Sequence, residues 1–202
     1  MESRIYLASR SPRRRELLNQ IGVRFDLLLF RAGMREDAET DESPVGGEKA
    51  EDYVVRVARA KAMHGADLVA SRHLPLRPVL SADTTLDLNG EIVGKPENEA
   101  HARDILTRLS GTAHRVLTAV AVAGSGRIEH ETSISEVRFR PLDEGEIRRY
   151  VASGEPMDKA GAYGIQGRAA TFVAEIRGSH SGIVGLPLCE TAVLLKRFGY
   201  PL

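Results

Sequence analysis

Short apolar segments alternate along this chain with longer amphipathic segments, and this alternation restricts the fold more than any other feature of the sequence. The first apolar run, Ile5 to Ala8, has the length of a strand. A helix is predicted from Ser11-Pro12 to Gly22, because proline suits the first position of a helix and glycine suits the residue after its end. Strands that alternate with helices indicate an α/β fold.

The same reasoning predicts the rest of the secondary structure. Apolar side chains at three- and four-residue steps predict a long helix over residues 49–64. Asn89-Gly90 predicts a hairpin turn within residues 85–93, and the mostly polar residues 31–48 are expected to form a loop. The remaining strands are predicted at residues 25–30, 78–83, 116–123, 128–140 and 172–176, and the remaining helices at 99–109, 143–153 and 187–198.

Length and charge balance exclude several classes of protein. The 202 residues suit a single domain, 1–202, and no linker divides them. The 28 basic residues balance the 28 acidic ones, so the chain has no overall field to attract nucleic acid. No stretch approaches the ~20 uninterrupted apolar residues of a membrane helix. We therefore expect neither a nucleic-acid nor a membrane partner. A single cysteine permits no internal disulfide, and this favours a cytoplasmic location. Cys189, the only cysteine, is predicted to lie in the core.

An arginine cluster marks the first strand-to-helix junction, Ser9 to Arg15, where Arg13 and Arg14 fall in the first helical turn. Cations are normally unfavourable there, because the helix dipole places about +0.5 charge at a helix N-terminus. The arginines are best explained if an anion binds beside them, with backbone N–H groups, hydroxyls and guanidinium groups around it. The cluster therefore predicts a phosphate site, and the alternative is a solvated arginine face.

Asp83 is the candidate for chemistry on the anion. It is predicted at the carboxyl end of a strand, with Thr84 and Thr85 beside it, where open α/β sheets gather their ligands. Its carboxylate could bind Mg²⁺, orient a water molecule or accept a proton. The alternative is an aspartate that caps a turn.

Three of the five lysines lie where they could reach a phosphate oxygen. Lys95 follows Gly94, and Lys159 lies in a glycine-rich segment that lets the backbone approach a ligand. Lys61 lies on a mostly apolar helix face. Alternatively, its aliphatic chain covers that face and its ammonium group reaches solvent. The acidic loop at 36–42 could lend a carboxylate to a metal, or be merely solvated.

Six segments form one ordered pattern. They are Leu7-Ala8-Ser9-x-Ser11-Pro12-Arg13-Arg14-x-Glu16-Leu17-Leu18, Ala82-Asp83-Thr84, Lys95-Pro96, Leu109-Ser110-Gly111 with His114, Asp158-Lys159-Ala160-Gly161-x-Tyr163-x-Ile165-Gln166-Gly167, and Gly185-Leu186-Pro187. Over nearly the whole chain this pattern resembles the Maf family of nucleoside triphosphate pyrophosphatases.

The resemblance implies an extended mixed β-sheet with flanking helices and a cleft between two lobes, a fold shared with inosine triphosphatases. It also implies hydrolysis of a noncanonical or pyrimidine nucleoside triphosphate to the monophosphate and pyrophosphate, with a divalent cation (Mg²⁺ or Mn²⁺). Protection of nucleotide pools is the role that the family suggests, and a homodimer is a possible assembly.

The resemblance also implies roles for individual residues. Asp83 matches the proton acceptor, and we expect it to bind the metal as well. A further metal-binding glutamate is expected after the second strand; Glu36 is our choice there, with Asp37 and Glu39 as alternatives. The substrate-binding residues, divided between base selection and phosphate contact, are expected to be Ser9, Arg13, Arg14, Lys61, Thr84, Lys95, Lys159 and Gln166.

Gln166 favours one branch of the family. Uracil and thymine present an N3–H donor between two carbonyl acceptors, and a glutamine amide offers one acceptor and one donor to that edge. A guanine-type ring presents two adjacent donors, which a carboxylate would suit better. We therefore expect dTTP and UTP as substrates. The alternatives are a 7-methyl-GTP-type pyrophosphatase, a regulatory protein that binds nucleotide without turnover, and a nucleic-acid-binding module.

Overall fold

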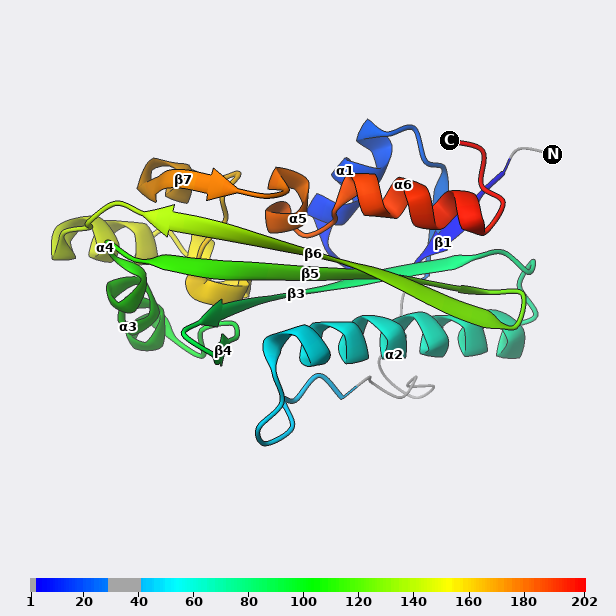
Figure 1. Cartoon of the computed structure of the whole chain (residues 1–202), viewed down its shortest axis with the longest axis horizontal. Coiled ribbons are helices and arrows are strands. Elements are labelled where there is room, and N and C mark those ends of the chain that lie inside the picture. Colours follow the sequence, from blue (N-terminus) through cyan, green and yellow to red (C-terminus); the bar gives the residue numbers. More distant parts are fainter. Residues whose placement is uncertain (1–2, 29–40) are drawn as a thin grey trace.

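The computed structural model describes residues 3–28 and 41–202, which form helices packed against one mixed sheet (Figure 1). The elements in chain order are β1 (Ile5–Leu7), α1 (Pro12–Gln20), β2 (Phe25–Leu27), α2 (Ala50–Ser71), β3 (Val79–Leu88), β4 (Glu91–Val93), α3 (Glu99–Leu109), β5 (Ala113–Gly124), β6 (Arg127–Phe139), α4 (Glu144–Val151), the 3₁₀ helices η1 (Glu155–Asp158), η2 (Ala160–Ala162) and η3 (Arg168–Phe172), β7 (Val173–Arg177), α5 (His180–Val184) and α6 (Leu188–Arg197).

The sheet has seven strands in the order β2-β1-β3-β5-β6-β7, and β4 pairs with β3. β1 is parallel to both β2 and β3, and the pairs from β3 to β7 are antiparallel. The predicted α/β class with an extended mixed sheet is therefore confirmed. In this register Asp83 lies opposite Ala119, and Thr84 lies opposite Thr118.

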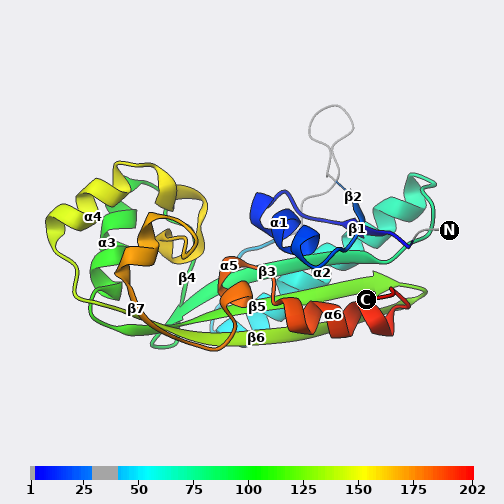
Figure 2. The ribbon, with the colours of Figure 1, turned by 90° about the horizontal axis from the view of Figure 1, so that it is seen from above.

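Two groups of elements lie at opposite ends of the long strands (Figure 2). One end carries α3, α4 and the 3₁₀ helices, whose core includes Leu106 and Phe139. The other end carries α1, α6, β1 and β2, whose core includes Leu18 and Leu194. β3, β5 and β6 run through both ends, and α2 covers the sheet on the face opposite α6 (Figure 1). These two ends are the two lobes that the family resemblance implies.

β3 differs from the prediction. Residues 78–83 were expected to end a strand at Asp83, but the strand continues to Leu88 and places Asp83 in its middle. The reason is that Thr84 and Thr85 are β-branched and fit a pleated, buried surface, and Thr85 is 2% exposed. Asp83 therefore belongs to a rigid strand and not to a loop.

α2 is longer than predicted, because it continues past His64 to Ser71. Gly65 lies inside the helix, where glycine has a packing role. A Cβ at this position would stand 2.7 Å from the Cγ1 of Val79, so the absence of a side chain lets α2 lie close to β3.

Cys189 is exposed, and its predicted core position is wrong. α6 buries Thr191, Leu194 and Leu195 instead, and at 100° per residue Cys189 points to the other side of the helix.

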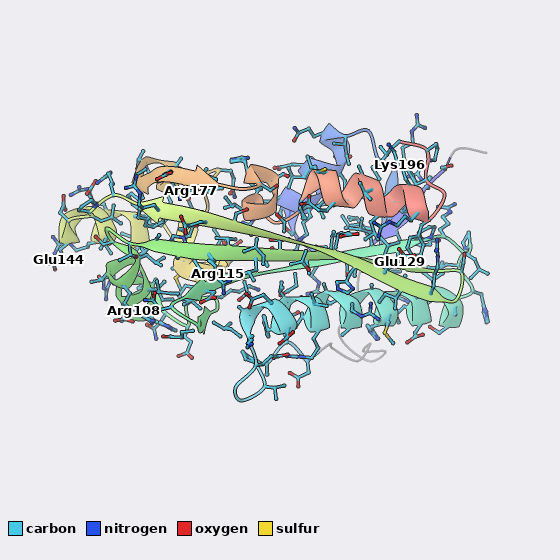
Figure 3. All side chains as sticks on the ribbon, viewed as in Figure 1. Arg108, Arg115, Glu129, Glu144, Arg177 and Lys196 are labelled. Atoms are coloured by element: carbon cyan, nitrogen blue, oxygen red, sulfur yellow. The ribbon has the colours of Figure 1, made fainter. Side chains whose placement is uncertain are left out.

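Charged side chains of both signs are interspersed on the outside at both ends of the molecule (Figure 3). Within the residues that the structure covers, no helix is long and apolar enough to cross a membrane.

A buried histidine joins the core of the α3–α4 lobe. The Nε2 of His114 lies 2.8 Å from the hydroxyl of Tyr163, and both rings meet Phe139 edge-on. Burial lowers the pKa of His114 from 6.5 to about 4, so the imidazole is neutral at pH 7.

The pKa of His114 predicts how stability changes with pH. Between about pH 4 and pH 6.5 the unfolded chain binds a proton that the folded chain excludes, so this residue makes stability rise with pH over that window. The full contribution is about 3 kcal/mol, at 1.36 kcal/mol per pKa unit. Urea unfolding of the wild type and of His114→Gln, from pH 4 to pH 7.5, should give free energies that diverge as the pH rises. Parallel curves would contradict the assignment.

Gly161 and Gly154 provide a matched test of packing between the lobe core and β3. Both have left-handed backbone, with φ of 71° and 74°. A Cβ at Gly161 would stand 2.3 Å from the Cδ1 of Leu86, whereas a Cβ at Gly154 would meet nothing within 4 Å. Gly154→Ala should cost only the strain of positive φ, about 1 kcal/mol. Gly161→Ala should cost about 3 kcal/mol, because overpacking is added to that strain. Equal losses in urea unfolding would mean that Leu86 moves aside freely.

Candidate active site

A cavity of about 660 Å³ lies between the two lobes. Its size falls within the range typical of small-molecule sites. Every predicted site residue within the described part of the chain lines this cavity: Ser9, Arg13, Arg14, Lys61, Asp83, Thr84, Lys95, Lys159 and Gln166. Glu36, the remaining predicted residue, lies outside the described residues. Their roles stay predictions, because only their position is observed.

Arg14 is held in place by contacts along one wall of the cavity. Its Nη1 donates to the Oγ of Ser9 over 3.3 Å, and its Nε donates to the carbonyl of Gly185 over 2.9 Å. Its Nη2 donates to the Oγ1 of Thr84 over 3.3 Å. Burial lowers the pKa of Arg14, although Asp83 acts in the opposite direction. The guanidinium therefore has a fixed orientation, with a positive charge at the start of α1.

Two threonines extend these contacts into the sheet. The Oγ1 of Thr118 donates its one proton to the carbonyl of Gly182 over 2.7 Å. In the 2.9 Å hydrogen bond between the two threonine hydroxyls, Thr84 is therefore the donor and Thr118 the acceptor. Thr84 then accepts from Arg14. The orientation of Arg14 is thus set through β3, β5 and α5.

The first helix begins without a side-chain cap. Ser11 occupies the N-cap position of α1 and makes no side-chain capping bond, and its own N–H donates to the Oγ of Ser9 over 3.2 Å. The first N–H groups of a helix have no partner within the helix. Together with Arg13 and Arg14, these groups give the cavity a wall suited to an anion.

Asp83 is a buried carboxylate with a cationic partner. It is 7% exposed, and its Oδ1 accepts from the Nζ of Lys61 over 2.9 Å. The same Nζ lies 2.9 Å from the Oε1 of Glu42. A buried carboxylate without a partner would be strongly destabilising. Lys61, expected to face phosphate, is therefore first of all the counter-charge of Asp83.

Glu42 is the site residue that sequence reasoning did not single out. It lines the cavity, and its backbone carbonyl accepts from the hydroxyl of Tyr53 over 2.9 Å. Burial, and secondly the nearby Asp83, raises the pKa of Tyr53 to about 12, so this donor stays protonated. The sequence offered one signal: among the acids of residues 36–42, Glu42 stands closest to the helix that carries Lys61.

The opposite wall carries the other lysines. The Nζ of Lys159 lies 2.5 Å from the Oδ1 of Asp158 and 2.5 Å from the carbonyl of Glu155. Across the cavity, the Nη1 of Arg13 lies 3.8 Å from the Oδ2 of Asp158. Lys95 is exposed, in a segment joined to η2 by a 3.0 Å hydrogen bond between the N–H of Gly161 and the carbonyl of Gly94.

Asp83 and Glu42 are two carboxylates that could hold a magnesium-type cation together with a phosphate ligand. Among residues 3–28 and 41–202, no group of three or more histidine, cysteine or acidic side chains could hold a metal. Asp83 and Glu42, however, both reach Lys61. Mg²⁺ is usually bound through one or two carboxylates, with phosphate and water oxygens supplying the other ligands.

The chain is similar to known proteins over nearly its whole length. The sequence model described as "Maf-like protein" matches residues 4–198. Three relatives share the name "dTTP/UTP pyrophosphatase". The protein from Dechloromonas aromatica is 65% identical over 98% of this chain and 98% of its own. The one from Aromatoleum aromaticum is 64% identical over 100% and 98%, and the one from Cupriavidus metallidurans is 57% identical over 98% of both.

Among solved structures, the Staphylococcus aureus Ham1 protein aligns with a TM-score of 0.49 and 14% identity over 97% of both chains. The family assignment comes from the sequence comparisons alone, which cover nearly every residue of the two lobes and of the cavity between them. On that basis the chain belongs to the Maf family.

Proposed function

We propose that this protein hydrolyses dTTP and UTP to the nucleoside monophosphate and pyrophosphate, and so removes these nucleotides from the cellular pool. The observation that carries the proposal is a cavity in which a buried carboxylate, Asp83, lies among six basic side chains from both lobes: Arg10, Arg13, Arg14, Lys61, Lys95 and Lys159. The name shared by relatives up to 65% identical supports the same activity.

The triphosphate suits the basic part of the cavity. Arg13 and Arg14 at the start of α1 and Lys159 opposite them offer charge from two sides. Three of the five N–H groups of Arg14 are already bound to protein atoms, so it acts as a fixed charge. Preorganised cations of this kind stabilise the charge that develops on a leaving pyrophosphate.

The base suits the part of the cavity next to Gln166, whose side chain is exposed there. Its amide can accept from N3–H and donate to a carbonyl of uracil or thymine. Asp83, on strand β3, lines the same cavity as Gln166.

In the proposed reaction, the oxygen of a water molecule bonds to the α-phosphorus. The bond from that phosphorus to the oxygen bridging to the β-phosphorus breaks, and its electron pair leaves with pyrophosphate. Asp83 orients the water and accepts its proton, which then passes to solvent. Lys61 holds the carboxylate in one position for this task.

A divalent cation is part of the proposal. Asp83 and Glu42 would hold it together with phosphate oxygens, and it would supply further positive charge to the triphosphate when bound.

The activity is tested by measuring pyrophosphate release, with Mg²⁺ or Mn²⁺, from dTTP, UTP, CTP, 7-methyl-GTP, ITP and the common purine triphosphates. We expect turnover of dTTP and UTP well above the others. Asp83→Asn should lower kcat at least about 100-fold, the usual contribution of a positioned general base.

Asp87→Asn is the matched control. Asp87 lies on the same strand and pairs with Arg115 away from this cavity, so its loss should lower stability and leave turnover by the folded protein unchanged. Preference for 7-methyl-GTP would contradict the reading of Gln166. Nucleotide binding without turnover would indicate a regulatory protein instead.

The cation site predicts the effect of Glu42→Gln. The Mg²⁺ concentration that gives half the maximal rate should rise about tenfold, since an amide is a weaker ligand than a carboxylate. Calorimetric titration with Mn²⁺ should show the same weakening. Glu48→Gln, which removes an ion pair with Arg56 on the same stretch, is the control and should change neither value. Unaltered metal dependence of Glu42→Gln would place the cation elsewhere.

A further inference from the structure

Gln166 occupies a tight turn. The N–H of Gly167 donates to the carbonyl of Gly164 over 2.9 Å, which closes a β-turn with Ile165 and Gln166 at its centre. Ile165 is 6% exposed, whereas Gln166 is exposed in the cavity. A Cβ on Gly164 would stand 3.2 Å from the Nε2 of Gln166, so the amide lies over the backbone of Gly164. The position of that amide therefore depends on what holds the two ends of the turn.

The carboxylate of Glu155 holds one end. Its Oε2 accepts from the N–H of Arg168, directly after the turn, over 3.2 Å. A Cβ on Gly167 would stand 2.1 Å from the Oε1 of Glu155, so only glycine lets the carboxylate approach this closely. Glu155 lies behind the turn and does not line the cavity.

Tyr150 connects Glu155 to the other end. Its hydroxyl accepts from the N–H of Gly164 over 3.3 Å and lies 3.1 Å from the Oε1 of Glu155. A carboxylate only accepts, so the hydroxyl proton points to Glu155. The ring of Tyr150 is 4% exposed and packs edge-on against Phe172 at 5.1 Å. The pair thus ties both ends of the turn to the rigid core of the lobe.

Selectivity between pyrimidines requires such a restraint. Cytosine reverses the pattern of uracil, with an acceptor at N3 and a donor at N4. A glutamine amide carries an acceptor and a donor side by side, and rotation exchanges them. An amide that could shift and rotate freely would pair with either base.

We propose that Glu155, oriented by Tyr150, is a positioning residue that sets pyrimidine selectivity: it fixes the turn from Gly164 to Gly167 so that Gln166 meets uracil or thymine in one orientation and excludes cytosine. This inference rests on the proposed function, and it adds two residues outside the cavity to the specificity machinery.

The test compares kcat/KM for pyrophosphate release from UTP and from CTP; where CTP turns over too slowly, its inhibition constant against UTP replaces its kcat/KM. In Glu155→Ala and in Tyr150→Phe, the preference for UTP over CTP should fall about tenfold, within the losses that small misplacements cause. The change should appear in the KM for UTP more than in kcat. In a Gln166→Ala background, Glu155→Ala should leave the remaining preference unchanged, because its effect acts through Gln166.

Glu146→Ala is the matched control. Glu146 also lies beside this lobe core, caps α4 and pairs with Arg140 at 2.6 Å, but it does not contact the turn. Its loss should lower stability and leave the preference for UTP unchanged.

An unchanged preference in Glu155→Ala, with an active wild type, overturns the inference, and so does an equal loss in the Gln166→Ala background. If Glu155→Ala does not fold, Tyr150→Phe decides the question, because it removes the hydroxyl that accepts from Gly164. An unchanged preference for UTP in that variant overturns the inference. A wild type that releases pyrophosphate from no nucleotide overturns the proposed function instead. In that case the affinities of the same variants for UMP and CMP, measured by calorimetry, test the inference. The preference for UMP over CMP should fall in Glu155→Ala and in Tyr150→Phe.

Discussion

The ion pair between Lys61 and Asp83 is the interaction on which the site depends most. A carboxylate in the middle of a buried strand needs a counter-charge, and α2 can supply one only if it lies close to β3 at one register. Two other features set that register. The Oγ of Ser81 donates to the carbonyl of Ala58 over 2.6 Å, and Gly65 leaves room for Val79. Packing and charge compensation therefore select the same placement of the helix.

Short chains of hydrogen bonds fix other charged groups around this ion pair. Thr84, next to Asp83, accepts from Arg14 and donates toward Thr118, so the strand that holds the carboxylate also orients a guanidinium group at α1. The facing wall has its own restraints, in which Asp158 and Glu155 hold Lys159. Arg14 and Lys159 are thus each fixed by partners of their own lobe or of the shared sheet.

Local patterns predicted the element types, but they could not predict contacts made through tertiary packing. Proline and glycine signals located the ends of α1, and Asn89-Gly90 located the turn between β3 and β4. The end of α2 was predicted too early, at His64. The glycine that follows, Gly65, does not end the helix: it makes room for Val79 of β3, a contact that the local sequence does not reveal. Glu42 was not singled out within the acidic loop, because its own segment does not show that Lys61, nineteen positions later, brings it close to Asp83. The grouping of the nine cavity residues followed from the family resemblance. Composition and periodicity carry no information on which distant segments lie together in the fold.

The length of the central strands has a mechanical consequence. β3, β5 and β6 have 10, 12 and 13 residues and pass without interruption from one lobe to the other. Enzymes that close around a substrate usually bend at a few loop residues between two rigid bodies. Here any relative movement of the lobes would have to twist three hydrogen-bonded strands together. The walls of the cavity are consequently set at nearly their working separation by folding itself, and adaptation to different substrates falls to side chains and to the segments at the rim.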